Sequence, residues 1–253
     1  MRWLATVGGA ELLLLLAASL GQAVHVSPVI AYAVGFAAVS GSALAVAANC
    51  PIASRRVAPL VMLPALALFG VSMVGAKGVE GAMVVTAGLL LGASLVGSAV
   101  GSAIDHPGHL IFVAVVSSAA DIFSVFHPSG PSAAILESEE ALSVLALPWP
   151  MLGTSNIEPF LGAGDVVFTG LYVVTARRHG LSLPRTLLAL AAAYGLTMIA
   201  VINHRMPLPA LPFLGLMMVL AHPQAWRPPE ADRVRGAVAC TVVLVAVAAM
   251  FLL

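Results

Sequence analysis

The sequence is poor in charge. Only 9% of its 253 residues are Asp, Glu, Lys or Arg, whereas 60% are hydrophobic; ordinary globular domains carry about 25% charged residues. A soluble fold cannot bury so large an apolar fraction, so the composition predicts a polytopic membrane protein. The formal net charge is zero and the basic residues are scattered, which argues against a nucleic-acid partner.

Cysteine is also scarce, and several common catalytic motifs are missing. The two cysteines, Cys50 and Cys240, are far apart and lack the spacing of metal ligands. Seven histidines are present, but there is no HExxH sequence, so a zinc protease is unsupported. The serine-protease pattern GxSG and the phosphate loop GxxxxGK[ST] are absent as well. The sequence therefore predicts no metal site and no cofactor.

Proline, glycine and charged residues divide the chain into nine hydrophobic segments. Most of them approach the roughly 17–25 residues that cross a bilayer as a helix, although the eighth is short and rich in proline. The segments are 3–24, 28–48, 57–75, 81–104, 109–126, 157–176, 183–202, 208–222 and 236–253. We expect an all-α bundle of about nine membrane helices.

The first segment has two interpretations. Residues 1–23 carry Arg2, an apolar core and a Gly-Gln-Ala end, which is typical of a cleavable signal peptide. Glu11 interrupts the core and favours a retained helix, in which it would be a further buried acid or a partner for another group. In the fourth segment, glycines recur at GxxxG spacing, which allows close helix packing. They are Gly88, Gly92, Gly97 and Gly101.

Basic residues gather on one side of the predicted topology. With nine spans, nine of the eleven basic residues fall in loops on one side, and only Lys77 and Arg205 fall on the other. Cytoplasmic loops of membrane proteins are enriched in Lys and Arg. We therefore expect the amino terminus in the cytoplasm and the acidic loop 127–156 outside.

Two aspartates lie within predicted membrane segments. Asp121 is five residues before Phe126, and Asp165 is eight residues after Ile157. Consecutive spans run antiparallel, so both residues are expected roughly 8–12 Å inside the same membrane face. An acid at membrane depth is a candidate functional residue. Two close carboxylates can share a proton, one serving as general base and the other as acid. The alternatives are a proton or ion site in a transporter and a structural acid that a neighbouring group satisfies.

Two further motifs accompany the aspartates. Gly162-Ala163-Gly164 precedes Asp165, and glycine there lets the backbone distort and lets a substrate strand approach closely. Pro209-Ala210-Leu211, with prolines on both sides, opens the short eighth segment. Non-helical backbone at membrane depth needs protein or water to satisfy it. These residues are the candidates for substrate binding or for shaping the site.

With these motifs the chain resembles the presenilin and signal peptide peptidase family of intramembrane aspartyl proteases, as a prokaryotic homologue. Asp121, the Gly-x-Gly-Asp sequence ending at Asp165, and the Pro-Ala-Leu sequence at 209–211 stand in the family's order. The stretch from Asp121 through Pro131 also looks like presenilin sequence. The resemblance covers roughly residues 115–170 and 207–214; elsewhere only the hydropathy matches.

The sequence departs from the family at three points. Ala120 replaces the tyrosine that usually precedes the first aspartate. Pro-Ala-Leu opens the eighth predicted span, whereas in the family it opens the last. The predicted orientation is that of signal peptide peptidases, although the sequence around Gly130-Pro131 looks like presenilin.

The resemblance implies an intramembrane aspartic endopeptidase with Asp121 and Asp165 as catalytic residues. It would be a single domain over 1–253, with scaffold helices in 1–104, catalytic helices and the Pro-Ala-Leu motif in 105–222, and a carboxyl-terminal helix in 223–253. Its substrates would be transmembrane helices or signal-peptide remnants, its surroundings the lipids of a prokaryotic cytoplasmic membrane. The alternatives are a proton- or cation-coupled transporter or leak channel, and a substrate-binding pseudoprotease. The oligomeric state is left open.

Overall fold

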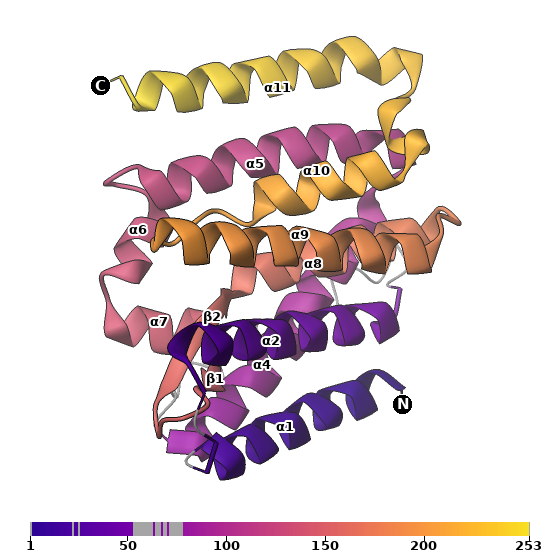
Figure 1. Cartoon of the computed structure of the whole chain (residues 1–253). Helices are drawn as coiled ribbons and strands as arrows, with labels where there is room; N and C mark the ends of the chain where they lie inside the picture. Colours follow the sequence, from indigo (N-terminus) through magenta and orange to yellow (C-terminus); the bar gives the residue numbers. More distant parts are fainter. Residues whose placement is uncertain are drawn as a thin grey trace. The chain divides into compact units, whose positions relative to one another are not determined.

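The structure, a computed structural model, is mostly helical (Figure 1). It describes residues 2–52 except 22 and 25, the positions 63, 67 and 70, and residues 78–252. The chain divides into two compact units, each taken by itself below. The first comprises Met1–Ala103 and Glu139–Val174, and the second Ile104–Ser138 and Thr175–Leu253.

The first unit combines helices with a β-hairpin. Its elements are α1 (Arg2–Gly21), α2 (Pro28–Asn49), α4 (Gly78–Ala103), α7 (Glu139–Leu145), β1 (Ala146–Pro150), β2 (Ile157–Gly162) and most of α8 (Ala163–Arg178). Ser27 caps α2 by accepting the N–H of Ile30 at 3.4 Å, and Pro28 follows as the first helical residue. Both residues are typical of a helix start.

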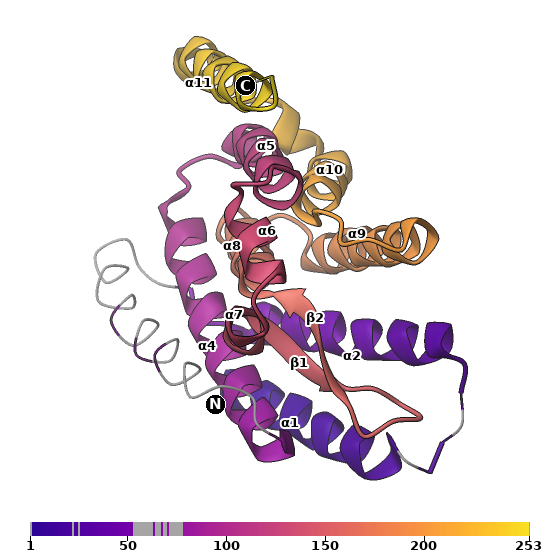
Figure 2. The same ribbon diagram turned by 90° about the vertical axis from the view of Figure 1, so that its left-hand side faces the viewer.

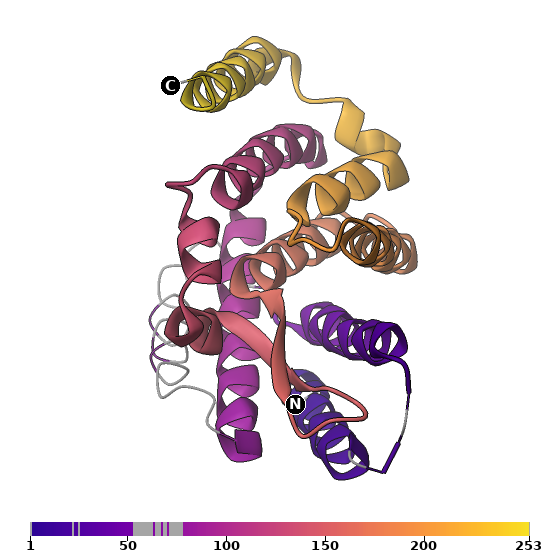
Figure 3. The same ribbon diagram turned by 60° about the vertical axis from the view of Figure 1, so that its left-hand side comes forward.

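The core of the first unit lies among α1, α2, α4 and the hairpin. These three helices contact one another, β1 packs on α4, and β2 packs on α2 (Figure 3). Every residue of β1 is buried. The Phe160 ring of β2 presses on α2 at Gly35, where an added Cβ would lie 2.7 Å from the ring. The hairpin is therefore part of the packed interior and not a loose connection.

Helices α4 and α8 cross at two glycines. A Cβ added at Gly97 would collide with the carbonyl oxygen of Val167 and lie 3.0 Å from the Cα of Gly170. One added at Gly170 would lie 3.2 Å from the carbonyl oxygen of Ser94. The glycine spacing of α4 thus allows close approach to the helix that carries Asp165.

The second unit consists of helices and short turns. Its elements are the 3-10 turn η1 (Pro107–His109), α5 (Leu110–Phe126), α6 (Pro131–Leu136), the end of α8, α9 (Leu183–His204), α10 (Leu211–Ala221), the 3-10 turn η2 (Pro223–Trp226) and α11 (Glu230–Met250). Helix α10 packs between α5 and α9, and α11 packs on α5 (Figures 1 and 2).

Helix α11 is fastened to α5 at both ends. At one end His109 Nε2 lies 3.1 Å from the Asp232 carboxylate. At the other, His127 Nε2 donates to the carbonyl oxygen of Met250 at 3.0 Å, and its ring packs edge-on against Phe251. None of the residues of α11, all of which are described, is buried. Two histidines at the two ends of α5 therefore bind α11, which also packs on α5 between them, with Gly236 close to the Phe112 ring.

Six of the described helices are long and apolar enough to cross a membrane, and α10 is a shorter apolar helix. The six spans are Arg2–Gly21, Pro28–Asn49, Gly78–Ala103, Pro107–Phe126, Leu183–His204 and Glu230–Met250. They agree with the predicted membrane segments of the same regions. The predicted segment 57–75 lies outside the described residues, apart from the positions 63, 67 and 70. A count of nine spans stays a prediction.

The prediction of one helical segment over 157–176 is wrong at its start. Residues 157–162 form β2, which pairs antiparallel with β1 and carries a register shift between Leu147 and Pro148. Helix α8 begins only at Ala163. The all-helical prediction also omits this sheet, and the connection 127–156 contains α6, α7 and β1. A run of apolar residues as short as 157–162 does not distinguish a strand from a helix.

Candidate functional site

Asp121 is bonded to the Pro-Ala-Leu sequence. Its side chain projects from α5, half-buried, and its Oδ2 accepts the backbone N–H of Leu211 at 2.9 Å. The Ala210 backbone makes a further interaction with the same carboxylate. All three residues of the motif, Pro209, Ala210 and Leu211, are buried. Two of the three predicted motifs thus meet in one place.

The local sequence explains why this contact forms. Leu211 is the first residue of α10, so its N–H has no partner within the helix. The residue before it, Ala210, makes no side-chain cap, and Pro212 in the next position has no N–H to offer. The amino end of α10 therefore lacks the usual cap, and the carboxylate of Asp121 supplies one from another helix. The helix dipole also favours a negative group at this end.

Asp165 stands in the first turn of α8, at the end of the hairpin. β2 ends at Gly162 and α8 begins at the next residue, so strand and helix join within the glycine motif. A Cβ added at Gly162 would lie 3.4 Å from Asp165 Oδ2, and one added at Gly164 would meet nothing within 4 Å. Ala163 and Asp165 are half-buried. At Gly162 and Gly164 no Cβ therefore covers the backbone next to this carboxylate.

The two aspartates belong to different compact units. Asp121 lies in the second unit together with the Pro-Ala-Leu sequence, and Asp165 in the first together with its glycines. The structure brings together the residues of each group. The pairing of Asp121 with Asp165 stays a prediction.

Helices α9 and α10 are joined by a buried histidine. His222, directly after α10, is 2% exposed, and its Nε2 lies 2.9 Å from the Oγ1 of Thr186 in α9. Burial, and then the positive charge of Arg185, lower the pKa of His222 below its ordinary value of 6.5. This contact fixes the end of α10 opposite to the one that binds Asp121.

Glu11 is a third acid within the apolar part of the chain. Both of its carboxyl oxygens are shielded from solvent and have no hydrogen-bond partner among the described residues. The indole Nε1 of Trp3, two helical turns earlier, is in the same situation. Val7 and Leu14 of α1 are buried as well. Helix α1 thus packs into the first unit, and the choice between a retained helix and a cleaved signal peptide stays a prediction.

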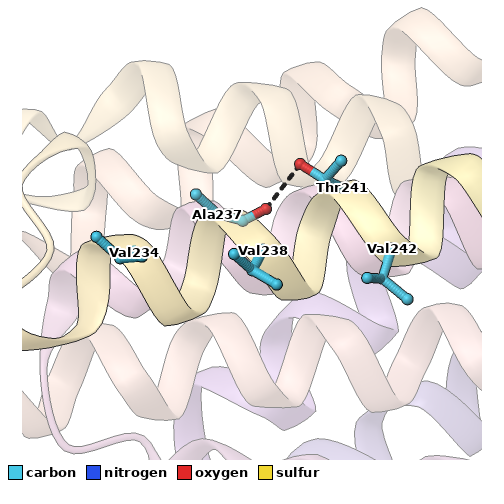
Figure 4. Close-up of a pocket in the computed structure, with 5 residues that line it drawn as sticks. All are labelled: Val234, Ala237, Val238, Thr241 and Val242. Carbon is cyan, nitrogen blue, oxygen red and sulfur yellow. Dashed lines mark hydrogen bonds between the residues drawn. The ribbon is translucent and has the colours of Figure 1, made fainter.

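A shallow pocket runs along one face of α11, between Val234 and Val242 (Figure 4). Its one polar side chain, Thr241, donates to the carbonyl oxygen of Ala237 in its own helix at 2.9 Å. In the described part of the chain, no group of three His, Cys, Asp or Glu side chains could hold a metal ion.

Sequence reasoning did not single out the side chains around the end of α5. Ser124, one turn after Asp121, bonds to Ser132 at the start of α6. The signal for that helix start was present in Gly130-Pro131, since Pro is frequent at the first helical position.

Compared with known protein families, curated proteins and solved structures, the chain gives no match in any of the three.

Proposed function

We propose that this protein is an intramembrane aspartic endopeptidase that hydrolyses peptide bonds within transmembrane segments. One observation carries the proposal: the backbone N–H of Leu211 is hydrogen-bonded to the carboxylate of Asp121 at 2.9 Å. The resemblance joins these two motifs in one active site, although 90 positions separate them in the sequence. The same bond caps α10, so it supports the proposal together with the resemblance and not by itself.

The proposed chemistry uses Asp121 and Asp165 as a pair. One carboxylate takes a proton from water, and the other, protonated, polarises the scissile carbonyl. The water oxygen then attacks the carbonyl carbon, and the amine leaves with a proton from the pair. The bond from Leu211 to Oδ2, with the further interaction of the Ala210 backbone, holds the carboxylate of Asp121 in place for water or substrate.

The substrate is a transmembrane helix or a signal-peptide remnant that has unwound locally, because a helix hides its carbonyls in internal hydrogen bonds. β2 supports binding of such a strand. It pairs with β1 along one edge, its other edge has no strand partner among the described residues, and it ends at Gly162, beside Asp165. Extended peptides commonly bind by adding to a free strand edge.

The proposed location is the cytoplasmic membrane of a prokaryote, with the amino terminus inside and the loop 127–156 outside. Charge within the second unit supports this orientation. His179, in the α8–α9 turn, donates to the carbonyl oxygen of Ile104, shortly before η1, at 2.8 Å, and η1 packs on η2. This end of the unit carries Arg177, Arg178, Arg185, Arg227, Arg233 and Arg235. Arg205 lies at the opposite end of α9, and cytoplasmic ends are rich in such residues.

The test is peptide cleavage by the purified protein. A synthetic transmembrane peptide is incubated with the wild type, Asp121→Asn and Asp165→Asn, and the products are mapped by mass. We expect discrete cleavage within the apolar stretch by the wild type and none by either variant. Glu137→Gln, a change of an exposed acid in the loop, is the matched control and should cleave normally.

The same variants separate the protease from the transporter. A protease cuts the peptide and moves no ions across sealed liposomes. Proton or cation flux that is lost in Asp121→Asn, without cleavage of any peptide by the wild type, would overturn the proposal.

A further inference from the structure

Helix α5 caps two other helices with two neighbouring side chains. Asp121 accepts the N–H of Leu211 at the start of α10, at 2.9 Å. Ser124 Oγ accepts the N–H of Ser132 in the first turn of α6, at 3.0 Å. Residues three apart lie side by side on a helix surface, one turn apart. The end of α5 therefore holds α10 and α6 through adjacent positions.

The contact with α6 is reinforced by the backbone. The hydroxyls of Ser124 and Ser132 are 2.7 Å apart, so they share a second hydrogen bond. Gly130 lies directly against the last turn of α5, where an added Cβ would be 2.7 Å from the carbonyl oxygen of Phe123 and would collide with that of Ser124. Its N–H also donates to the carbonyl oxygen of His127 at 2.8 Å. The chain after α5 thus folds back and binds the turn that follows Asp121.

The position of Asp121 depends on this turn. α5 ends at Phe126, five residues after Asp121, so the carboxylate stands near a helix end. Helix ends fray because their last carbonyls lack partners within the helix. Fraying past Ser124 would move Asp121 away from the amide of Leu211. A contact that holds the last turn therefore also holds the carboxylate.

We propose that Ser124 and Ser132 are positioning residues for Asp121, which keep its carboxylate at the amide of Leu211. The part of this proposal that concerns catalysis rests on the proposed function. The part that concerns the bond between Asp121 and Leu211 is independent of it. The two serines act through the last turn of α5 and do not touch the substrate.

The direct test is hydrogen–deuterium exchange of the peptide 206–213, which contains the amide of Leu211. Wild type, Ser124→Ala and Ser132→Ala are compared with Ser118→Ala. Ser118 is the matched control because it stands on the same helix and, among the described residues, its hydroxyl bonds within α5, donating to the carbonyl oxygen of Ala114 at 2.6 Å. We expect exchange of this peptide to be about 2- to 10-fold faster in the first two variants, as expected for one weakened hydrogen bond. The control should match the wild type.

Cleavage kinetics give a second measurement. Ser124→Ala and Ser132→Ala should lower kcat by a similar factor and leave KM unchanged, because substrate binding does not involve these serines. Ser124→Thr, which keeps the hydroxyl, should restore both kcat and slow exchange. If the alanine variants acted only by lowering overall stability, kcat and exchange would follow the unfolding temperature across the three variants. A positioning role predicts recovery in Ser124→Thr without such a correlation.

The two failures can be told apart. A wild type that cleaves nothing overturns the proposed function, while faster exchange at 206–213 in the two serine variants still supports the positioning of Asp121. Exchange at 206–213 that is unchanged in both serine variants overturns the positioning role, whatever the cleavage activity.

Discussion

Asp121 and Leu211 are joined by a hydrogen bond of 2.9 Å in which a carboxylate on one helix accepts the first backbone N–H of another. The bond gives the Pro-Ala-Leu sequence a physical role that its side chains alone do not reveal. The motif starts α10, which has no cap from its own residues, and the candidate catalytic acid Asp121 supplies that cap. Structure and proposed chemistry therefore depend on the same carboxyl group.

Asp121→Ala and Asp121→Asn should separate these two roles. Removing a helix cap costs about 0.5–2 kcal/mol, so Asp121→Ala should lower the unfolding temperature in detergent. Asparagine keeps a side-chain oxygen that can accept the N–H of Leu211, so Asp121→Asn should stay near the wild type in stability and lose only cleavage. Equal unfolding temperatures for alanine and asparagine variants would show that the bond does not stabilise α10.

Gly97→Ala should destabilise the protein. The added Cβ would meet backbone atoms of α8, including the amide nitrogen of Leu171 at 2.9 Å, and backbone cannot move aside as a side chain can. Overpacking of this kind costs about 1–3 kcal/mol. The matched control is Gly195→Ala in α9, where an added Cβ meets nothing within 4 Å. This control should not lower the unfolding temperature. At most it should raise the unfolding free energy, by about 0.4–1 kcal/mol.

The stability of the protein should fall with acidification, in part through His222. Its pKa in the folded state is below the ordinary 6.5, first because of burial and second because of Arg185. Above pH 6.5 both folded and unfolded states are neutral at this position, and the full stability is present. Below it the unfolded chain binds a proton more readily than the folded one, so the unfolding free energy decreases until the folded histidine also protonates.

Unfolding temperatures measured from about pH 8 to about pH 5 check this prediction. The slope should be smaller in His222→Gln, which cannot titrate. It should also be reduced in Arg185→Gln, because removal of the positive charge brings the pKa of His222 closer to its ordinary value. Identical slopes in wild type and His222→Gln would remove this histidine from the pH dependence.

Cysteine labelling tests the proposed orientation within the second unit. In a background without Cys50 and Cys240, single cysteines replace Glu137 and Gln224, both exposed. An impermeant maleimide should label Glu137→Cys in intact cells and Gln224→Cys only after the membrane is opened, because the arginine-rich end faces the cytoplasm. The reverse pattern would invert the topology.

The helices could be predicted from the sequence largely because their ends are marked locally. Pro28 and Pro184 stand at the starts of α2 and α9, and the predicted starts at 28 and 183 agree with the structure. β2 could not be predicted in this way. It depends on pairing with β1, and each of the two strands contains proline, with Pro148 opposite Pro159. Proline is unusual within a strand, and no local pattern reveals a distant partner.

The candidate site was predictable as a set of residues but not as a set of contacts. Asp121 and Leu211 were both singled out by their chemistry, yet the bond between them uses a backbone amide, which every residue except proline has. Only the packing of α5 on α10 decides which amide faces the carboxylate. Ser124 lies in the stretch that resembles presenilin, but neither it nor Ser132 carries charge or a catalytic motif, so the sequence did not reveal that they bond to each other.

Helix α11 has a consequence for how such a chain can evolve. None of its residues is fully buried. It packs on α5, is bonded at its two ends by His109 and His127, and lies close to the Phe112 ring at Gly236. Residues on the outer face of such a helix can change without disturbing neighbours, whereas a change in a close-packed core is felt by all its neighbours. The outer face of α11 is thus freer to change than the interior. The capping of α10 by Asp121 is not free in this way, because the carboxylate and the amide of Leu211 constrain each other.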